Sequence, residues 1–283
     1  MFRPEKRLLV VEGYDPAGIA KLAEAGATKA SLLYKRMLGQ YVDEELIDIA
    51  EMSAPDAPQI DPSQYAGICW TGSNLFFSEK DDLVQRHIDW CRTFFEQGIP
   101  QMGSCWGAQL AAVAAGGKCE ANPKGREFGV GRKILLTTEG RSHPMYDGKH
   151  GVFDAFESHG DIITQLPEGG VLLAGNAFSP VQALDVTHLN GRFWAFQYHP
   201  EYDFAEIGAL AIVRMGDLVS QGSFKSEAAV MEFADDMRAL NTDPSRADIM
   251  WKWGMDDDLA DPAKRTLEVK NWLHHMVKGS DQA

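Results

Sequence analysis

The first two hundred residues alternate between short apolar runs and longer segments in which apolar residues recur at helical spacing. Apolar runs of about 4–8 residues are typical of buried strands. They predict strands at Arg7–Glu12, Leu46–Met52 and Tyr65–Thr71, a fourth that starts at Ile99, and a fifth at Phe193–Tyr198.

The segments between these runs carry apolar residues three or four positions apart, which indicates amphipathic helices. One helix is expected to run through about Gly39, and another covers Asp81–Gln97. Their apolar faces comprise Ile19, Leu22, Leu32, Leu33 and Met37 in the first, and Leu83, Val84, Ile88, Cys91, Phe94 and Phe95 in the second. The Pro- and Asp-rich segment Ser53–Ser63 is expected to be a loop.

Strands and helices in this order imply the α/β class, with a doubly wound, mostly parallel open sheet. Short strands dominate from Lys118 to Val186, and we expect an antiparallel extension on one edge. A site in such a sheet belongs at the carboxyl ends of its strands, where Gly72, Cys105 and His199 all fall.

From about Phe204 onward the pattern is helical. Helices are expected over Phe204–Val219, Ala228–Leu240 and Asp261–Val277. The last has an Asp cap, Pro262 at its first position, and Gly279 to close it.

Three of the seven tryptophans lie in this C-terminal part: Trp251, Trp253 and Trp272. So many large aromatic residues favour a segment packed against the core. Two tryptophans two positions apart cannot share one helix face, which predicts a bend or extended segment there. The part acts either as a structural brace or as a lid or partner-docking surface.

Composition narrows the functional classes. The chain has 283 residues, is 45% hydrophobic and carries a net charge of −14. That charge argues against nucleic-acid and anionic-membrane partners, which require a positive surface. No signal peptide is apparent and no apolar run reaches the ~18 residues of a membrane helix. Four unpatterned cysteines fit a reducing compartment, so we expect a cytoplasmic protein.

Cys105 has the most specific surroundings of any candidate residue. It stands between Gly103 and Gly107, after an apolar run and before a helical segment. This is the Gly-x-nucleophile-x-Gly spacing of a nucleophile elbow, in which side chains at the glycine positions would collide with the strand and helix. The dipole of the following helix favours the thiolate. Cys69, Cys91 and Cys119 lack this context and are interpreted as packing residues.

A second element lies far downstream. His199 ends an aromatic-rich strand, and Pro200 biases its backbone towards an extended form. Residues two apart on extended chain point the same way, so Glu201 can reach the imidazole. A carboxylate on one ring nitrogen leaves the other to face a nucleophile.

These motifs resemble the class I glutamine amidotransferases, the Cys-His-Glu triad family that includes the glutaminase domain of GMP synthase. The similarity rests on Gly-Ser-Cys-Trp-Gly-Ala-Gln at 103–109 and His-Pro-Glu at 199–201. Further similar segments are the strand and loop Tyr65–Ser73, and the short motifs Arg126–Gly129, Ser158–Asp161 and Leu166–Gly169. The resemblance implies a class I amidotransferase-like domain over residues 1–221 and a helical extension over 222–283 packed on the core.

The resemblance also implies acyl transfer to Cys105, with His199 as base and acid and Glu201 orienting it. Backbone amides of Gly72 and Trp106 would form the oxyanion hole. Gln109 and the segment Ser158, His159, Gly160 and Asp161 would hold the amino-acid end of glutamine.

Plainer interpretations stay open for four of these residues. Gln109 can be solvent-facing, His159 structural, and Arg126 with Glu127 a surface ion pair. No cofactor and no metal is expected.

The chain departs from the family in two places. Only about eighty residues follow Glu201, too few for the usual ~100–150-residue domain such as the ATP pyrophosphatase of GMP synthase. Ser73-Asn74 replaces the commoner Gly-Pro, which puts the second oxyanion contact in question.

Three functions therefore remain: an amidotransferase subunit that supplies ammonia to a separate synthetase, a stand-alone hydrolase of γ-glutamyl amides, and a catalytically silent interaction protein. The first is favoured. Because a small rotation of Thr71–Asn74 can remove an oxyanion donor, we expect the isolated chain to hydrolyse glutamine slowly until an acceptor enzyme binds.

Overall fold

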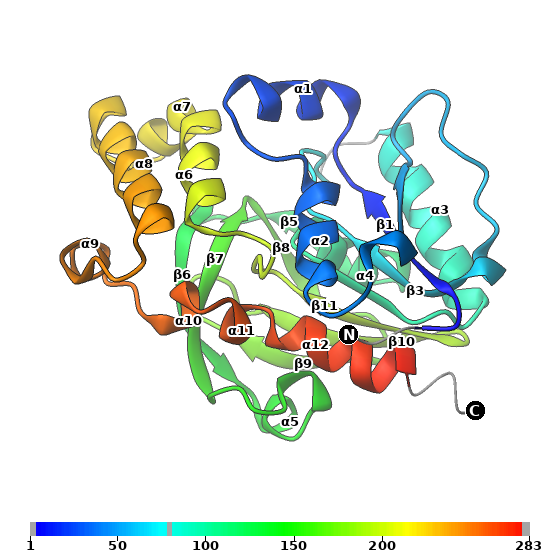
Figure 1. Ribbon diagram of the computed structural model, residues 1–283. Helices are drawn as coiled ribbons and strands as arrows, with labels where there is room; N and C mark the ends of the chain where they lie inside the picture. Colours follow the sequence, from blue (N-terminus) through cyan, green and yellow to red (C-terminus); the bar gives the residue numbers. More distant parts are fainter. Residues whose placement is uncertain (1–3, 78–80, 279–283) are drawn as a thin grey trace.

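A nine-stranded sheet runs through the molecule in the computed structural model, which describes residues 4–77 and 81–278 (Figure 1). The strand order is β2-β1-β3-β4-β11-β10-β9-β6-β7. The first five strands are parallel: β2 (Ile47–Glu51), β1 (Arg7–Glu12), β3 (Tyr65–Trp70), β4 (Gln101–Ser104) and β11 (Gly191–Phe196).

The other strands form the antiparallel extension that the sequence predicts at one edge. They are β10 (Ala183–His188), β9 (Gly170–Gly175), β6 (Glu127–Leu136) and β7 (Val152–His159). A separate antiparallel pair is made by β5 (Lys118–Ala121) and β8 (Asp161–Gln165).

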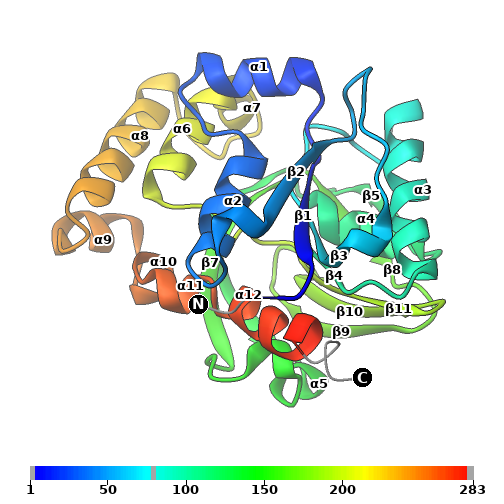
Figure 2. The same ribbon diagram turned by 45° about the vertical axis from the view of Figure 1, so that its right-hand side comes forward.

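Helices cover both faces of the parallel half, because its strands are apolar on both sides. In β1, Leu8 and Val10 belong to one core cluster and Leu9 and Val11 to the other. The first face is covered by α2 (Ala30–Gly39) and α12 (Leu267–Trp272), and the second by α3 (Asp82–Glu96) and α4 (Trp106–Ala114) (Figures 1 and 2).

A third apolar cluster joins helices from the two ends of the chain. Its helices are α1 (Pro16–Glu24), α6 (Phe204–Val213), α7 (Met215–Ser220), α8 (Glu227–Thr242) and α9 (Ala247–Trp253). The remaining short helices are α5 (Thr138–Arg141), α10 (Asp257–Ala260) and α11 (Pro262–Arg265), with 3-10 turns at Glu44–Leu46, Pro62–Gln64 and Pro144–Tyr146.

Three predicted helices are broken where the sequence pattern looked continuous. The segment up to Gly39 forms α1 and α2, separated at Gly26, whose φ of +75° lies in the left-handed region. Phe204–Val219 is divided at Arg214 into α6 and α7. Asp261–Val277 begins with the expected Asp261 cap and then breaks at Thr266 before α12 and a π-helical turn. The predicted closing residue, Gly279, lies outside the described residues.

The expected bend around Trp251 and Trp253 is wrong, because both residues lie in α9. Trp251 points outward and is 79% exposed, whereas Trp253 packs against Phe233 with ring centroids 4.9 Å apart. Because only Trp253 packs against the protein, the two tryptophans do not need to lie on the same face of α9.

Trp272 fastens the C-terminal helices to the sheet. It is fully buried, and its indole N–H donates to the Gln101 carbonyl at 3.1 Å. A Cβ on Gly67 in β3 would lie 2.6 Å from its ring, so a glycine is needed beneath it. The division into domains at residues 221 and 222 stays a prediction. No helix among the described residues is both long and apolar enough to cross a bilayer.

Candidate active site

Cys105 lies in a strained turn between β4 and α4. Its φ of 51° and ψ of −104° are unusual for a residue with a side chain. A Cβ on Gly103 or on Gly107 would lie 2.9 Å from the Trp70 carbonyl oxygen, so neither position accepts a side chain without movement. The strand, the turn and the helix have the geometry that the elbow motif predicts.

Cys105 is 7% exposed, and its Sγ lies 3.9 Å from the Ser158 carbonyl oxygen. Burial raises the pKa of Cys105 to about 12, the Glu157 carboxyl adds to the rise, and the Arg126 and Arg214 guanidiniums oppose it. Burial therefore opposes the effect of the helix N-terminus, and a neighbouring base would be needed to take the thiol proton.

His199 is the candidate for that base. Its Nδ1–H donates to Glu201 Oε1 at 2.7 Å, while its buried Nε2 has no hydrogen-bond partner among the described residues. A Cβ on Gly72 would lie 3.2 Å from His199 Cε1 and 3.9 Å from Cys105 Cβ, so the three residues are neighbours. The Tyr202 ring stacks on the imidazole, with centroids 3.9 Å apart and the planes 6° from parallel.

Two further residues orient the carboxylate, and the sequence contained no signal for either. The Ser104 hydroxyl donates to Glu201 Oε1 at 3.0 Å. The Tyr34 hydroxyl, from α2, donates to Ser104 Oγ at 2.7 Å and accepts from the Ser104 amide at 2.8 Å. This chain of hydrogen bonds holds Glu201 beneath the imidazole.

The two expected oxyanion donors flank Cys105. Trp106 is the first residue of α4, so its amide has no acceptor within the helix. Its ring stacks on Phe77 at 4.1 Å, which fixes this end of the helix. Gly72 follows β3 on the other side of the thiol.

The loop that carries Gly72 is tied to the loop after β1. Ser73 Oγ donates to the Gly13 carbonyl at 2.7 Å, the Gly13 amide donates to Thr71 Oγ1 at 2.8 Å, and the Asp15 amide donates to Asn74 Oδ1 at 3.1 Å. Ser73 and Asn74 therefore anchor this loop.

A cavity of about 360 Å³ opens over Cys105. Its walls include all five expected substrate-binding residues: Gln109, Ser158, His159, Gly160 and Asp161. Gln109 is 4% exposed and its Nε2 donates to the Asp161 carbonyl at 3.0 Å, so the solvent-facing interpretation is wrong.

The side chains of Arg126 and Glu127 have different surroundings, so they do not form a surface ion pair. Arg126 lines the cavity and its Nη1 donates to the Ser158 carbonyl at 3.4 Å, whereas its buried Nε has no partner among the described residues. Arg214 lies on the same wall and donates from Nε to Ser158 Oγ at 3.0 Å. Burial and the neighbouring Arg214 charge lower the pKa of Arg126 to about 10.

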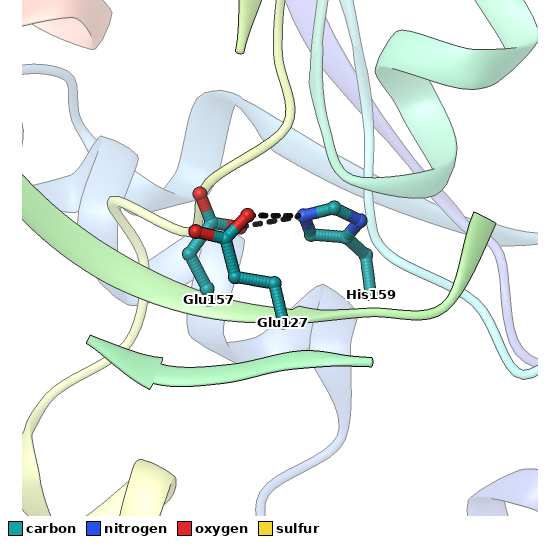
Figure 3. Close-up of side chains that lie close together, drawn as sticks. All are labelled: Glu127, Glu157 and His159. Carbon is teal, nitrogen blue, oxygen red and sulfur yellow. Dashed lines mark hydrogen bonds and ion pairs between the residues drawn. The ribbon is translucent and has the colours of Figure 1, made fainter. Parts of the chain in front are cut away.

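His159 Nε2 faces two buried carboxylates. That nitrogen lies 3.1 Å from Glu127 Oε2 and 3.4 Å from Glu157 Oε2, in a fully buried group (Figure 3). This placement favours a structural role for His159 over a second catalytic base.

Comparison with known proteins gives one family. The family model described as glutamine amidotransferase class-I matches residues 49–212. A γ-glutamyl-L-1-hydroxyisopropylamide hydrolase from a Pseudomonas species is 31% identical over 96% of this chain and 93% of its own length. The GMP synthase of Methylobacillus flagellatus is 36% identical over 44% of this chain, a match that spans only 24% of that enzyme.

Solved structures share the fold. A glutamine amidotransferase from Thermotoga maritima superposes with a TM-score of 0.66 at 13% identity, covering 96% of this chain and 98% of that one. A glutamine amidotransferase from Methylobacillus flagellatus gives 0.63 at 16% identity, with 94% and 95% covered.

Proposed function

Because this chain belongs to the class I glutamine amidotransferase family, we propose that it hydrolyses γ-glutamyl amides through a thioester on Cys105. The observation that carries the proposal is the buried pair of His199 and Glu201 beside the elbow cysteine, with Nε2 left without a partner among the described residues.

In this mechanism His199 Nε2 takes the thiol proton as Sγ attacks the γ-carbonyl carbon. The amides of Gly72 and Trp106 hold the oxyanion, and Glu201 stabilises the imidazolium. Collapse of the intermediate breaks the C–N bond, and the imidazolium gives its proton to the departing amine. Water, deprotonated by His199, then cleaves the thioester and releases glutamate.

Arg126 and Arg214 would bind the α-carboxylate of the γ-glutamyl group. Two guanidiniums on one cavity wall repel each other, and Arg126 keeps a buried donor without a partner among the described residues. A carboxylate between them would relieve the repulsion and accept that bond. Ser158, which both guanidiniums contact, would set its distance from Cys105.

Three observations favour a stand-alone hydrolase over a unit that waits for an acceptor enzyme. The loop bearing Gly72 is held by Ser73 and Asn74, so it lacks the freedom that an idle oxyanion hole requires. The relative that matches nearly the whole chain is named as a γ-glutamyl amide hydrolase. A cavity of about 360 Å³ also falls in the range that accepts ligands larger than glutamine.

The second candidate is a glutaminase that supplies ammonia to a partner. It is favoured by the similarity to GMP synthase, an enzyme named as glutamine-hydrolysing. The substrate would then be glutamine itself, and the same residues would carry the reaction.

The test is hydrolysis by the purified chain of glutamine, a γ-glutamyl alkylamide, and the same alkylamide with its α-carboxylate replaced by a carboxamide. We expect the alkylamide to be the best substrate, with activity unchanged by cell extract and abolished in Cys105→Ala. Arg214→Gln should raise KM for the alkylamide ~30-fold, the effect of about 2 kcal/mol from a lost charge-assisted bond, and leave KM for the carboxamide unchanged.

Three results would contradict parts of this scheme. Slow glutamine hydrolysis that rises on adding extract favours the ammonia-supplying candidate. Full activity in Cys105→Ala would exclude a thioester on Cys105 as the intermediate. If Arg214→Gln raises KM equally for the alkylamide and for its carboxamide analogue, the carboxylate subsite is wrong, but the thioester mechanism is unaffected.

A further inference from the structure

A second polar group lies behind the active-site cavity. Glu127 opens β6 and pairs in register with His159 on β7, while Glu157 and His159 lie two residues apart and share one face of β7. Figure 3 shows the two carboxylates side by side with the imidazole pointing at both. All three side chains are buried, with Glu157 at 0% exposure.

The hydrogen atoms in this group can be assigned. His159 Nδ1 lies 2.9 Å from the Asp161 carbonyl oxygen, which can only accept, so Nδ1 carries the proton. In the neutral ring Nε2 then presents a lone pair, and it faces Glu127 Oε2 at 3.1 Å and Glu157 Oε2 at 3.4 Å. Neither oxygen of Glu157 has a hydrogen-bond partner among the described residues. When both carboxylates are ionised, three lone pairs converge on one buried point.

We propose that Glu127, Glu157 and His159 bind a divalent cation of the first transition row. Ligand atoms about 2.0–2.2 Å from such an ion lie roughly 3.0 Å apart at octahedral angles and 3.4 Å apart at tetrahedral angles. The measured separations of 3.1 and 3.4 Å match these values, and all three ligand atoms lie within 4.8 Å of one another. Two carboxylates and an imidazole suit Zn²⁺, Mn²⁺ or Fe²⁺.

The surroundings have the features of a metal site's outer shell. The His159 N–H bond to the Asp161 carbonyl fixes the tautomer that frees Nε2 for a metal. Asn176 Nδ2 donates to Glu127 Oε1 at 2.7 Å and Gln182 Nε2 donates to Oε2 at 2.9 Å, which holds that carboxylate in its orientation. A Cβ on Gly131 would lie 2.5 Å from Glu157 Cγ, so a glycine makes room for the third ligand.

Burial of two carboxylates side by side is costly without a compensating cation, and a divalent ion neutralises both. No ligand spacing in the sequence marks the site, because Glu127 meets His159 only through the pairing of β6 and β7.

The ion has a structural role for the catalytic cavity. Ser158 lies between two of its ligands in the chain, and its carbonyl oxygen is the one that lies 3.9 Å from Cys105 Sγ. A bound cation would hold this peptide in place against the attraction of Arg126 and Arg214.

The test is binding of Co²⁺, Zn²⁺ and Mn²⁺, each alone, to the full chain stripped with a chelator and dialysed. We expect elemental analysis to find one bound metal ion per chain. Bound Co²⁺ should give an absorption spectrum in the visible range that differs from that of Co²⁺ in water, and each ion should raise the melting temperature of the chain. Asn176→Ala should weaken Co²⁺ binding ~10–100-fold through the lost outer-shell bond, and Glu157→Gln should weaken it at least as much.

Two control variants make the readout specific. Cys105→Ala removes a thiol, a possible metal ligand that lines the neighbouring cavity. Asp185→Asn removes a buried carboxylate that pairs with a different histidine, His143. Both should bind Co²⁺ like the parent chain. Absence of binding to the parent chain at millimolar Co²⁺, Zn²⁺ and Mn²⁺ would overturn the proposal and assign a shared proton to the group. Equal binding by Glu157→Gln and the parent would overturn it as well.

Discussion

Replacing Trp272 with alanine should destabilise the whole molecule, because this side chain joins the C-terminal helices to the central sheet. The residue is 0% exposed and packs over Gly67, where no Cβ fills the space it would leave. A fully buried Trp→Ala change costs about 3–5 kcal/mol in unfolding free energy. Loss of the indole bond to the Gln101 carbonyl adds about 1 kcal/mol. A total of about 4–6 kcal/mol is a large part of the 5–15 kcal/mol typical of a domain.

Trp251 provides the matched control, since it lies in the same C-terminal part and is 79% exposed. Trp251→Ala should change the unfolding free energy by no more than about 0.5 kcal/mol. Urea unfolding followed by circular dichroism measures both variants, with the slope m checked for constancy. Equal stabilities of the two variants would refute the brace and leave a lid or docking surface as the role of these helices.

Three smaller changes test the site and its surroundings. Ser104→Ala removes one hydrogen bond to the Glu201 carboxylate and should lower kcat about 10-fold, the rate equivalent of ~1.4 kcal/mol, with KM unchanged. Gly72→Ala places a methyl 3.2 Å from the imidazole and should lower kcat at least about 10-fold, whereas Gly216→Ala, with nothing within 4 Å, should be neutral. Burial raises the pKa of Glu206 from 4.5 to about 7, so its protonated form adds ~3 kcal/mol of stability below pH 4.5 that is lost as the pH rises through 7. Chemical unfolding of Glu206→Gln across this range should show a flatter dependence on pH.

The sequence predicted the elements that local patterns determine. The strand Arg7–Glu12 has the predicted bounds, and the predicted helix Asp81–Gln97 differs only in that its end residues cap α3. The Cys105 turn was equally predictable, because two glycines at fixed spacing between a strand and a helix have few other uses. Its positive φ and the contacts of Gly103 and Gly107 bear out that reasoning.

The failures come from effects that a local pattern does not contain. A single left-handed residue, Gly26, divides a helical segment whose apolar spacing continues past it. Arg126 and Glu127 looked like an ion pair because they are adjacent, but consecutive residues at the start of β6 point in opposite directions. One faces the cavity and the other the buried His159. The bonds from Tyr34 to Ser104 and on to Glu201 join residues far apart in the chain, so only the folded structure brings them together.

The central claim is that catalysis passes through a γ-glutamyl thioester on Cys105. The most direct measurement is acid quench of the purified chain during turnover of γ-glutamyl-p-nitroanilide, followed by mass spectrometry of the intact protein and its peptides. The good leaving group makes formation of the thioester fast relative to its hydrolysis, so the adduct accumulates. We predict a mass increase of one γ-glutamyl group on the peptide that contains Cys105, and no increase in Cys105→Ser. Turnover without any adduct, or an adduct on Cys69, Cys91 or Cys119, would contradict the account.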